Sequence, residues 1–530
     1  MGRGARRRGG QDRRAGQLLR PRRRLAADHA GHLPGQRRGA APLAPGPLPA
    51  PDRGAARDGG RTGGGGRSAA GRPGAPDTRP ARVRRDQGAS PHLLARPVLV
   101  ELAEGTAEEG LRTALAALVA RHDALRSRFE QADGSWWQRI APSAAAGDPL
   151  RRFDLRATAG SGVGEAAEIT AVREAVDSFV AGEAARGLDP AGEPLRASLL
   201  DFGPGRRPWL CLTVHPLAAD TRSWRILLDD LERAYRQSVA GTQVDLGPEP
   251  SSFRHWAGLL AGHAAAGGFD EELAYWTALP DTALPDTALP DTVLPPEGPG
   301  EAPPVAGEVS VSLGEGESGA LLRAAPAALR AGIGDVLLGA LGRVLCRWTG
   351  ADRVQVELEG HGREEIFDGV DLSRAVGRFA GTFPVVLGGT PGGAPPDWPA
   401  IVRAVRGRLR AVPSAGLGYG ALRHLAPRPP GEDRPRVAFA FHEPVDPGES
   451  VLYRSFHSPP PARRAEPVAP GVRPLEITAY LADGRLRFDW RHVVGVHDRA
   501  TVERLAEDLL EALRAVAAHI DPAAGRAERE

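Results

Sequence analysis

The chain has 530 residues, of which 41% are hydrophobic, so it is long enough to form more than one domain with a sizeable core. All 68 basic residues are arginine and asparagine is absent, a composition typical of a GC-rich gene, so the arginine count alone indicates no nucleic-acid partner. No run of about 18 uncharged apolar residues occurs, and the start of the chain lacks the apolar core of a signal peptide, so we predict a cytoplasmic protein without a membrane span. Because only 2 cysteines are present, we expect neither a disulfide framework nor a metal site.

The first segment of the chain differs from the rest in composition. Residues 1–90 carry 21 arginines and 6 aspartates and contain no Glu, Ile, Phe, Tyr or Trp. Such a segment cannot bury enough apolar surface to offset the entropy of ordering, so we predict that residues 1–86 are disordered. Out-of-frame or mis-started translation of GC-rich DNA has the same composition. The charge would suit a nucleic-acid-binding tail, but no aromatic residue is present to stack on bases, and we do not expect that function.

Regular patterning begins near Asp86. An apolar strand is predicted over Pro97–Leu102, and a capping-box pattern of Thr106 with Glu109 predicts that a helix follows. His122 lies on the apolar face of this helix. A histidine in that position is more often a packed, hydrogen-bonded core residue than a catalyst, and we interpret it so.

The next informative stretch joins a strand to a helix. A short apolar strand, Trp209–Val214, leads into His215 and Pro216, and Asp220 follows before an amphipathic helix, Ser223–Tyr235. Pro216 has neither a titratable side chain nor a backbone N–H.

A repeat divides the chain into two halves. Between Leu279 and Pro290 the pentapeptide Leu-Pro-Asp-Thr-Ala is iterated. Proline at every fifth position excludes a helix or an internal strand, so we interpret residues 278–304 as a linker.

The second half repeats the style of the first. An apolar helix is predicted over Ile333–Trp348, and an alternating strand, Asp352–Glu359, ends in the sequence Glu-Gly-His-Gly-Arg. The two glycines permit close backbone approach, which suits a site at a strand end as well as a solvated turn. A hairpin over Leu475–Trp490 and a closing helix complete the pattern.

Several segments together resemble a known family. Their order and spacing are similar to those of the condensation-domain superfamily of non-ribosomal peptide synthetases, from about Asp86 to Ile520. Within that superfamily Ser223–Leu228 (SWRILL) and the EGHGRE segment most resemble epimerization domains. The segments are Arg121–Phe129 (RHDALRSRF), His215–Tyr235 (HPLAADTRSWRILLDDLERAY), Tyr275–Trp276, Glu359–Glu364 (EGHGRE), Asp371–Leu387 (DLSRAVGRFAGTFPVVL) and Gly418–Leu425 (GYGALRHL).

The resemblance implies an α/β fold of two lobes, each similar to chloramphenicol acetyltransferase, which form a V-shaped pseudo-dimer with a tunnel at their junction. A carrier protein would insert its phosphopantetheine arm there, so no bound cofactor is expected. Tyr419, Phe439 and Phe441 are expected to line the tunnel. The predicted segments are a disordered region (1–86), an N-terminal lobe (87–277), a repeat linker (278–304), a C-terminal lobe (305–520) and a tail (521–530).

The resemblance also implies the chemistry. The substrate is an aminoacyl or peptidyl thioester, whose carbonyl acidifies the adjacent Cα–H. Conversion from L to D needs a base on one side of Cα and a proton donor on the other. By resemblance Glu359 is the candidate base, Pro216 occupies the position of the family's second histidine, and His361 is a candidate second group.

Four further residues match mainly structural positions of the family. An aspartate buried beside an arginine would hold its loop in place, and would not react. The implied partners are peptidyl or aminoacyl carrier proteins and other synthetase modules, with neither a membrane nor nucleic acid expected. The four structural residues are His215, Asp220, Ser223 and Arg363.

The chain departs from the family pattern at several positions. Pro216 removes a working group, Thr221 stands where a small residue is common, and Arg378 replaces a frequent tryptophan. Residues 439–443 lack the asparagine and glycine of a family motif. Residues 1–90 contain no match to the family's opening strand and helix, so we expect unpaired backbone groups at the edge of the first sheet.

Three functions remain open. The chain is an epimerization domain by descent, with weak or no activity. Alternatively, it is a non-catalytic module that docks carrier proteins or tailoring enzymes. In the third interpretation it is a condensation-type acyl or peptidyl transferase that uses another base, such as His361.

Overall fold

The computed structural model describes residues 81–83, 96–132, 135–142, 147–156, 165–186, 188–189, 191–279, 305–388, 396–426, 435–442, 450–457, 473–482 and 484–520. The repeat linker from residue 280 to 304, the tail from residue 521 and residues 1–80 lie outside these ranges.

The first large sheet has five strands in the order β12-β2-β7-β6-β5, and only β5 and β6 run parallel. Successive side chains of β2 lie on opposite faces of the sheet. Val98 and Val100 pack in one core cluster with helices α1 and α3, whereas Leu99 packs in another with α2. The elements are β2 (Arg96–Leu102), α1 (Glu108–Arg121), β5 (Leu150–Asp154), α2 (Glu165–Arg186), β6 (Leu195–Asp201), β7 (Trp209–Val214), α3 (Thr221–Val239) and β12 (Tyr453–His457).

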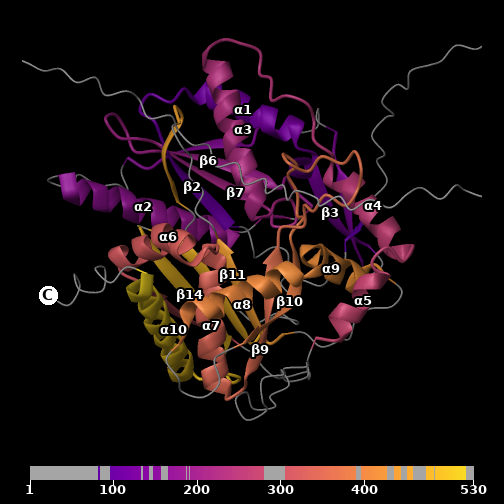
Figure 1. Cartoon of the computed structure of the whole chain (residues 1–530). Coiled ribbons are helices and arrows are strands. Elements are labelled where there is room, and N and C mark those ends of the chain that lie inside the picture. Colours follow the sequence, from indigo (N-terminus) through magenta and orange to yellow (C-terminus); the bar gives the residue numbers. More distant parts are fainter. Residues whose placement is uncertain are drawn as a thin grey trace, which may run out of the picture. The chain divides into compact units, whose positions relative to one another are not determined.

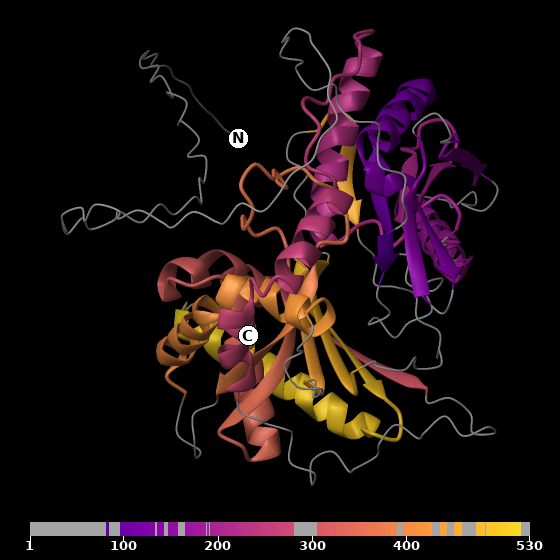
Figure 2. The same ribbon diagram turned by 90° about the vertical axis from the view of Figure 1, so that its right-hand side faces the viewer.

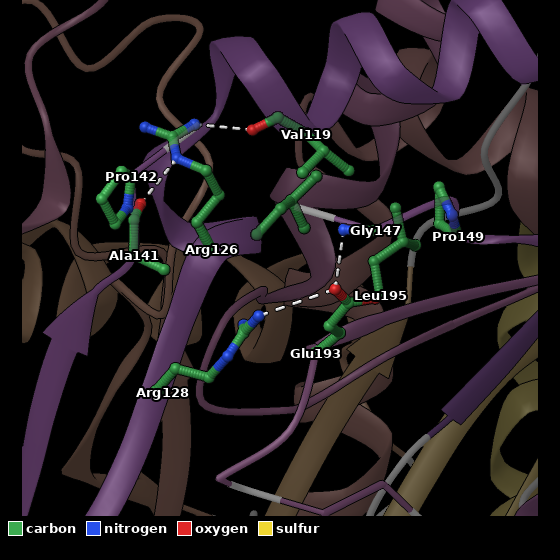
Figure 3. A pocket seen from close by; sticks show the side chains of 10 residues that line it. Val119, Arg126, Arg128, Ala141, Pro142, Gly147, Pro149, Glu193 and Leu195 are labelled. Carbon is green, nitrogen blue, oxygen red and sulfur yellow. Dashed lines mark hydrogen bonds and ion pairs between the residues drawn. The ribbon is translucent and has the colours of Figure 1, made fainter. Parts of the chain in front are cut away.

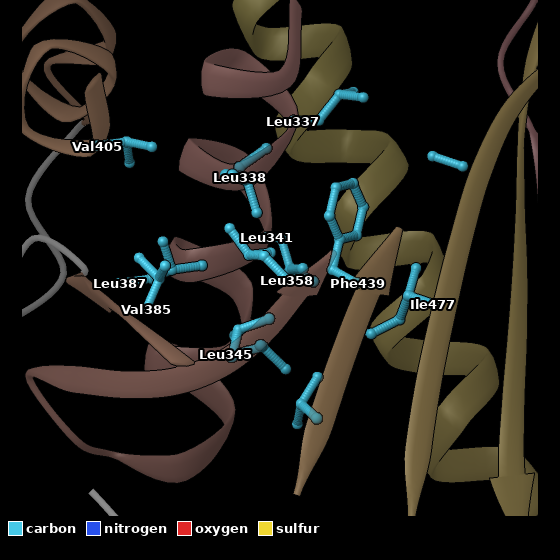
Figure 4. Packing of buried hydrophobic residues seen from close by; sticks show 14 of the residues in the cluster. Leu337, Leu338, Leu341, Leu345, Leu358, Val385, Leu387, Val405, Phe439 and Ile477 are labelled. Atoms are coloured by element: carbon cyan, nitrogen blue, oxygen red, sulfur yellow. The ribbon is translucent and has the colours of Figure 1, made fainter. Parts of the chain in front are cut away.

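The second large sheet has six strands in the order β10-β9-β11-β13-β14-β8. Helices α6, α7 and α10 pack on it, and α8 and α9 contact its edge strand β10 (Figure 1). Figure 4 shows Leu341 and Leu345 of α7 beside Leu358 of β9 and Phe439 of β11 in this core. The elements are β8 (Ala306–Ser312), α6 (Glu315–Leu329), α7 (Ile333–Thr349), β9 (Arg353–Gly360), β10 (Gly381–Gly388), α8 (Trp398–Ala411), α9 (Leu417–His424), β11 (Val437–His442), β13 (Leu475–Ala482), β14 (Arg485–Val493) and α10 (Arg499–Ile520).

A third, smaller sheet has the order β1-β4-β3. Its strand β1 (Ala81–Val83) lies at the end of the segment 1–86, and its backbone pairs with residues of β4. Its other strands are β3 (Ser127–Ala132) and β4 (Ser135–Ile140).

The two halves exchange elements. Strand β12 comes from the C-terminal half but joins the first sheet, where it pairs antiparallel with β2. Helices α4 (Phe253–Ala265) and α5 (Asp270–Thr277) come from the N-terminal half but contribute Trp256 and Trp276 to the core of the second sheet. The packing therefore differs from the predicted lobes 87–277 and 305–520 at these elements. Figure 2 shows α3 beside the segment that follows β9 in the chain.

The pairing of β12 with β2 corrects one expectation. The edge of β2 is not left unpaired, because β12 occupies it through pairs such as Phe456 with Val100. A strand supplied from a distant part of the chain satisfies the exposed ladder groups as well as a leading strand would. Local prediction also failed at the start of α1, because Thr106 caps no helix N–H and its hydroxyl donates to the carbonyl of Ala103 at 2.7 Å.

No single helix in the described ranges is long and apolar enough to cross a membrane, whereas α6 and α7 together reach that length and composition with a bend of 98° between them. Both helices bury their apolar residues in the second core.

The second lobe contains a buried histidine that makes its stability depend on pH. His497 is 5% exposed and its ring lies 5.7 Å from that of Trp348. Burial, reinforced by His492 and Arg436 and opposed by Asp498, lowers the pKa of His497 from 6.5 to about 4. The folded protein is therefore most stable above pH 6.5, where the ring is neutral in both the folded and the unfolded chain. Stability is lost as the pH falls from 6.5 toward 4, because only the unfolded chain takes up the proton there.

We expect the free energy of unfolding to be about 2 kcal/mol smaller at about pH 5 than at about pH 7.5 on account of this residue. Urea denaturation at the two pH values measures the difference. His497→Leu has no group to protonate, so its loss between the two pH values should be smaller by about that amount. An equal loss in both proteins would contradict the assignment.

Candidate active site

Asp220 begins helix α3 and is buried. Its Oδ1 accepts hydrogen bonds from the backbone N–H of Ser223 at 2.9 Å and from the Ser223 hydroxyl at 2.8 Å. An aspartate at this position satisfies helix donors that would otherwise be unpaired. The sequence places Asp220 directly after the loop that contains His215 and Pro216, so the N-cap also fixes that loop.

The same carboxylate ties the two halves together. Arg363, from the segment after β9, donates to Asp220 Oδ2 at 2.7 Å and to Oδ1 at 2.9 Å, and both side chains are nearly inaccessible to solvent. The backbone N–H groups of Phe379 and Ala380 donate to Oδ2 at 3.1 and 3.3 Å. The guanidinium also lies 4.3 Å from the centre of the Phe379 ring. Asp220 is therefore the centre of a junction between α3 and the second half.

Two small residues allow this close approach. Gly362 has φ of +67°, and a Cβ there would lie 1.9 Å from the carbonyl oxygen of Phe379. Gly377 contacts the Ser223 hydroxyl, whose oxygen accepts from the Gly377 N–H at 3.2 Å and lies 3.0 Å from the Gly377 carbonyl oxygen. Gly362 is thus required by geometry, and a Cβ on Gly377 would lie 2.9 Å from the Phe379 ring and 3.0 Å from Phe253.

A second junction lies further along α3. The fully buried Asp230 accepts from Arg374 of the second half and lies 2.9 Å from His122 Nε2. Burial acts to raise the pKa of Asp230, but the hydrogen bonds from His122 and Arg374 outweigh it and hold the pKa below its usual value. His122 is 2% exposed, which confirms its interpretation as a packed core histidine.

His215 belongs to the packing of the loop. It is 1% exposed, its Nδ1 accepts from the N–H of Leu217 at 3.2 Å, and its ring stacks on Phe129 with centroids 5.5 Å apart. Pro216 follows and is half-buried. A side chain at position 216 is thus more accessible than that of position 215.

Glu359 lies at the end of β9, where it is paired with Thr382 of β10. One third of its side chain is exposed, and its Oε2 lies 3.5 Å from Nη2 of Arg378. The arginine that replaces a frequent family tryptophan therefore places a positive charge beside the candidate base. Glu357 lies two residues earlier on the same face of β9, but it is buried in an ion pair with Arg473.

His361 and Glu364 follow in the loop that carries Arg363. His361 Nδ1 accepts from the N–H of Arg363 at 3.0 Å, and Glu364 Oε1 lies 3.4 Å from the same nitrogen. Burial, with Arg222 and Arg363 nearby and Asp220 opposing them, lowers the pKa of His361 to about 4, so the ring is neutral at pH 7. Burial raises the pKa of Glu364.

The structure thus brings Asp220, Ser223 and Arg363 into direct contact, with His361 close to them. Sequence analysis did not single out Glu364, because a carboxylate within a run of charges is usually solvated. The only available signal was its position in EGHGRE, directly after the arginine.

The predicted tunnel residues lie in the second lobe. Tyr419 and Phe439 are 6% and 5% exposed and belong to its core, where Tyr419 packs against Trp276, and Phe441 is half-buried at the rim of that core. Their role as tunnel lining remains a prediction.

A small pocket lies in the first lobe and contains none of these three residues (Figure 3). Arg126 donates to the carbonyl of Val119 at 2.6 Å, and Glu193 accepts from the N–H of Gly147 at 2.9 Å and lies 3.7 Å from Arg128. Its charged groups are engaged by the pocket wall itself. Elsewhere in the described ranges, no three His, Cys, Asp or Glu side chains come together as a metal site.

Comparison with known proteins identifies the family. The model of the condensation domain matches residues 88–527. The chain belongs to the condensation-domain family. This condensation domain is 33% identical over 420 residues to one of the linear gramicidin synthase proteins of Brevibacillus parabrevis, and 31% identical over 442 residues to chondramide synthase of Chondromyces crocatus. These matches cover 77% and 81% of the chain but only 5% and 11% of the two synthases, so the chain spans a small part of these relatives.

Solved structures agree with the fold. The epimerization domain from the third module of tyrocidine synthetase B has a TM-score of 0.63 and 26% identity, with 81% of this chain and 93% of that chain covered. The X-domain from teicoplanin biosynthesis has a TM-score of 0.54 and 21% identity, with 81% of this chain and 90% of that chain covered. At this identity the similarity supports the shared fold and nothing further. The fold is therefore the predicted mixed α/β fold with lobes similar to chloramphenicol acetyltransferase.

Proposed function

We propose that this condensation domain is of the epimerization type and acts on an aminoacyl or peptidyl group carried as a phosphopantetheine thioester. The observation that carries the proposal is the partly exposed Glu359 at the end of β9, beside a loop anchored on Asp220. Its partners would be a carrier protein, which delivers the phosphopantetheine arm, and neighbouring synthetase modules.

The chemistry follows from the thioester. Glu359 would take the Cα proton, and the electron pair would delocalise onto the thioester carbonyl as an enolate. Return of a proton to the opposite face of Cα gives the D product, and return from Glu359, after its proton has been replaced by one from the solvent, gives exchange with retention. Pro216 cannot hold or donate a proton, so activity would be low, although the carboxylate alone suffices for exchange.

The test uses an L-aminoacyl thioester on a carrier protein in deuterated water. Wild type should incorporate deuterium at Cα, and Glu359→Gln should lower the rate by about 10²-fold or more, because an amide cannot accept the proton. Glu365→Gln, an exposed neighbour in the same loop, is the matched control and should leave the rate unchanged. Mass spectrometry of the released amino acid measures the incorporation.

A docking module is the second candidate. Pro216 favours it, as does the similar fold of the teicoplanin X-domain, which has been solved in complex with OxyB. Carrier binding without deuterium incorporation in the same assay would support this candidate and contradict the first. Amide formation with an added amine acceptor would instead support the transferase interpretation, in which His361 is the base.

A further inference from the structure

The loop after β9 contains a buried carboxyl group that the proposed mechanism does not use. Only 13% of the Glu364 side chain is exposed, and both of its carboxyl oxygens are buried without a hydrogen-bond partner from another residue in the described part of the chain. A buried carboxylate without such bonds is costly, whereas the protonated acid is not. The surroundings of Glu364 therefore favour a group that holds a proton.

The group that Glu364 faces is a histidine whose tautomer is fixed. The backbone N–H of Arg363 donates to His361 Nδ1, which therefore carries the lone pair, so the neutral ring has its proton on Nε2. Oε1 of Glu364 lies 3.4 Å from Nδ1, slightly beyond a hydrogen bond, as is common in an acid–base pair before substrate binds. About one third of the His361 side chain is exposed.

The position of the pair relates it to the missing histidine. His361 is close enough to Asp220, Arg222 and Arg363 to respond to their charges. Arg222 and Asp220 belong to the start of α3, directly after the loop that contains Pro216. Arg363, whose N–H binds His361, also binds Asp220 at the end of the loop that contains Pro216, so His361 lies near that end of the loop.

We propose that Glu364 and His361 form a proton-supplying pair that takes over the task of the residue lost at Pro216. This inference rests on the proposed epimerization function. His361 Nε2 gives its proton to the Cα carbanion while Nδ1, released from the Arg363 N–H, takes the Glu364 proton. Water then reprotonates Nε2 and Nδ1 returns its proton to Glu364, so both groups regain their starting forms. His361 is then a catalytic residue, and Glu364 is a positioning residue that acts through it.

The surroundings of the pair set the protonation of each group. Burial favours the protonated form of Glu364, whereas Arg222 and Arg363 favour its ionised form. Burial, Arg222 and Arg363 favour the neutral form of His361, whereas Asp220 favours its protonated form. The pair requires the acid form of Glu364, so formation of D product should decline as the pH rises through the pKa of that carboxyl group. Deuterium exchange at Glu359 should not share this decline.

The test is chiral analysis of the product of Glu364→Gln in the exchange assay. Glutamine keeps the shape and can still donate a hydrogen bond to Nδ1, but it cannot supply a proton. We expect formation of D product to fall by about 10-fold or more and to lose its decline at higher pH, while deuterium exchange continues. Continued exchange also shows that the variant is folded, and Glu365→Gln is the matched control.

The outcomes separate the two proposals. Wild-type exchange with D product unchanged in Glu364→Gln would overturn the pair alone. Absence of any exchange in wild type would overturn the epimerization function and the pair with it. A fall in D product with exchange retained supports both.

Discussion

Asp220→Ala is expected to lower the free energy of unfolding by about 3–5 kcal/mol, because it leaves the buried Arg363 guanidinium without its partner. The substitution also removes the acceptor for the N–H groups of Phe379 and Ala380 and the N-cap of α3. Each of these losses adds to the destabilisation. Urea denaturation measures it.

An exposed ion pair provides the control. Arg139 and Glu130 form one on the small sheet, with 57% and 54% of their side chains accessible. Glu130→Ala should cost less than about 1 kcal/mol, because water screens exposed charges. If Asp220→Ala cost no more than this control, the junction would not hold the two halves together.

A double variant isolates the pair itself. In Asp220→Ala with Arg363→Met, no buried charge remains unpaired, so the combined loss should be smaller than the sum of the single losses by about 2 kcal/mol. Simple additivity would mean that the two side chains are not energetically coupled.

The second large effect is a gain of activity. Pro216→His is expected to raise the rate of D-product formation by about 10²-fold or more, because it adds a proton donor at the position where the resemblance places a histidine. Position 216 is half-buried, and the preceding His215 is held by Leu217 and Phe129, so the loop is already shaped by other contacts. Chiral analysis of the product, with deuterium incorporation, measures the gain.

Pro216→Ala is the matched control for this variant. It removes the proline ring without adding a titratable group, so its rate should stay at the wild-type value. A rise with alanine equal to that with histidine would mean that the proline acts by shaping the loop and not by lacking a proton-transfer group.

Much of the fold could be predicted from the sequence where the pattern was local. The alternation of Val354, Val356 and Leu358 predicted a strand with one buried face, and β9 has it. The exchange of elements could not be predicted, because Tyr453–His457 carries no local sign that its partner is β2 in the other half. Pairing between distant segments depends on the whole fold.

The site was predictable in part and for a similar reason. Motif resemblance pointed to Asp220, Ser223 and Arg363, but no spacing rule places residues 220 and 363 within hydrogen-bond distance. The role of Glu364 depends on burial, which its immediate neighbours in sequence, Arg363 and Glu365, do not indicate. The Glu359–Arg378 contact likewise arises only when the end of β9 meets the loop that precedes β10.

The most direct test of the central claim, an epimerization-type site with one group missing, is deuterium incorporation at Cα by Pro216→His with and without Glu359→Gln. We predict strong incorporation and D product from Pro216→His, and the loss of both in the double variant. Equal incorporation by the two proteins would contradict the account, because Glu359 would then not be the base.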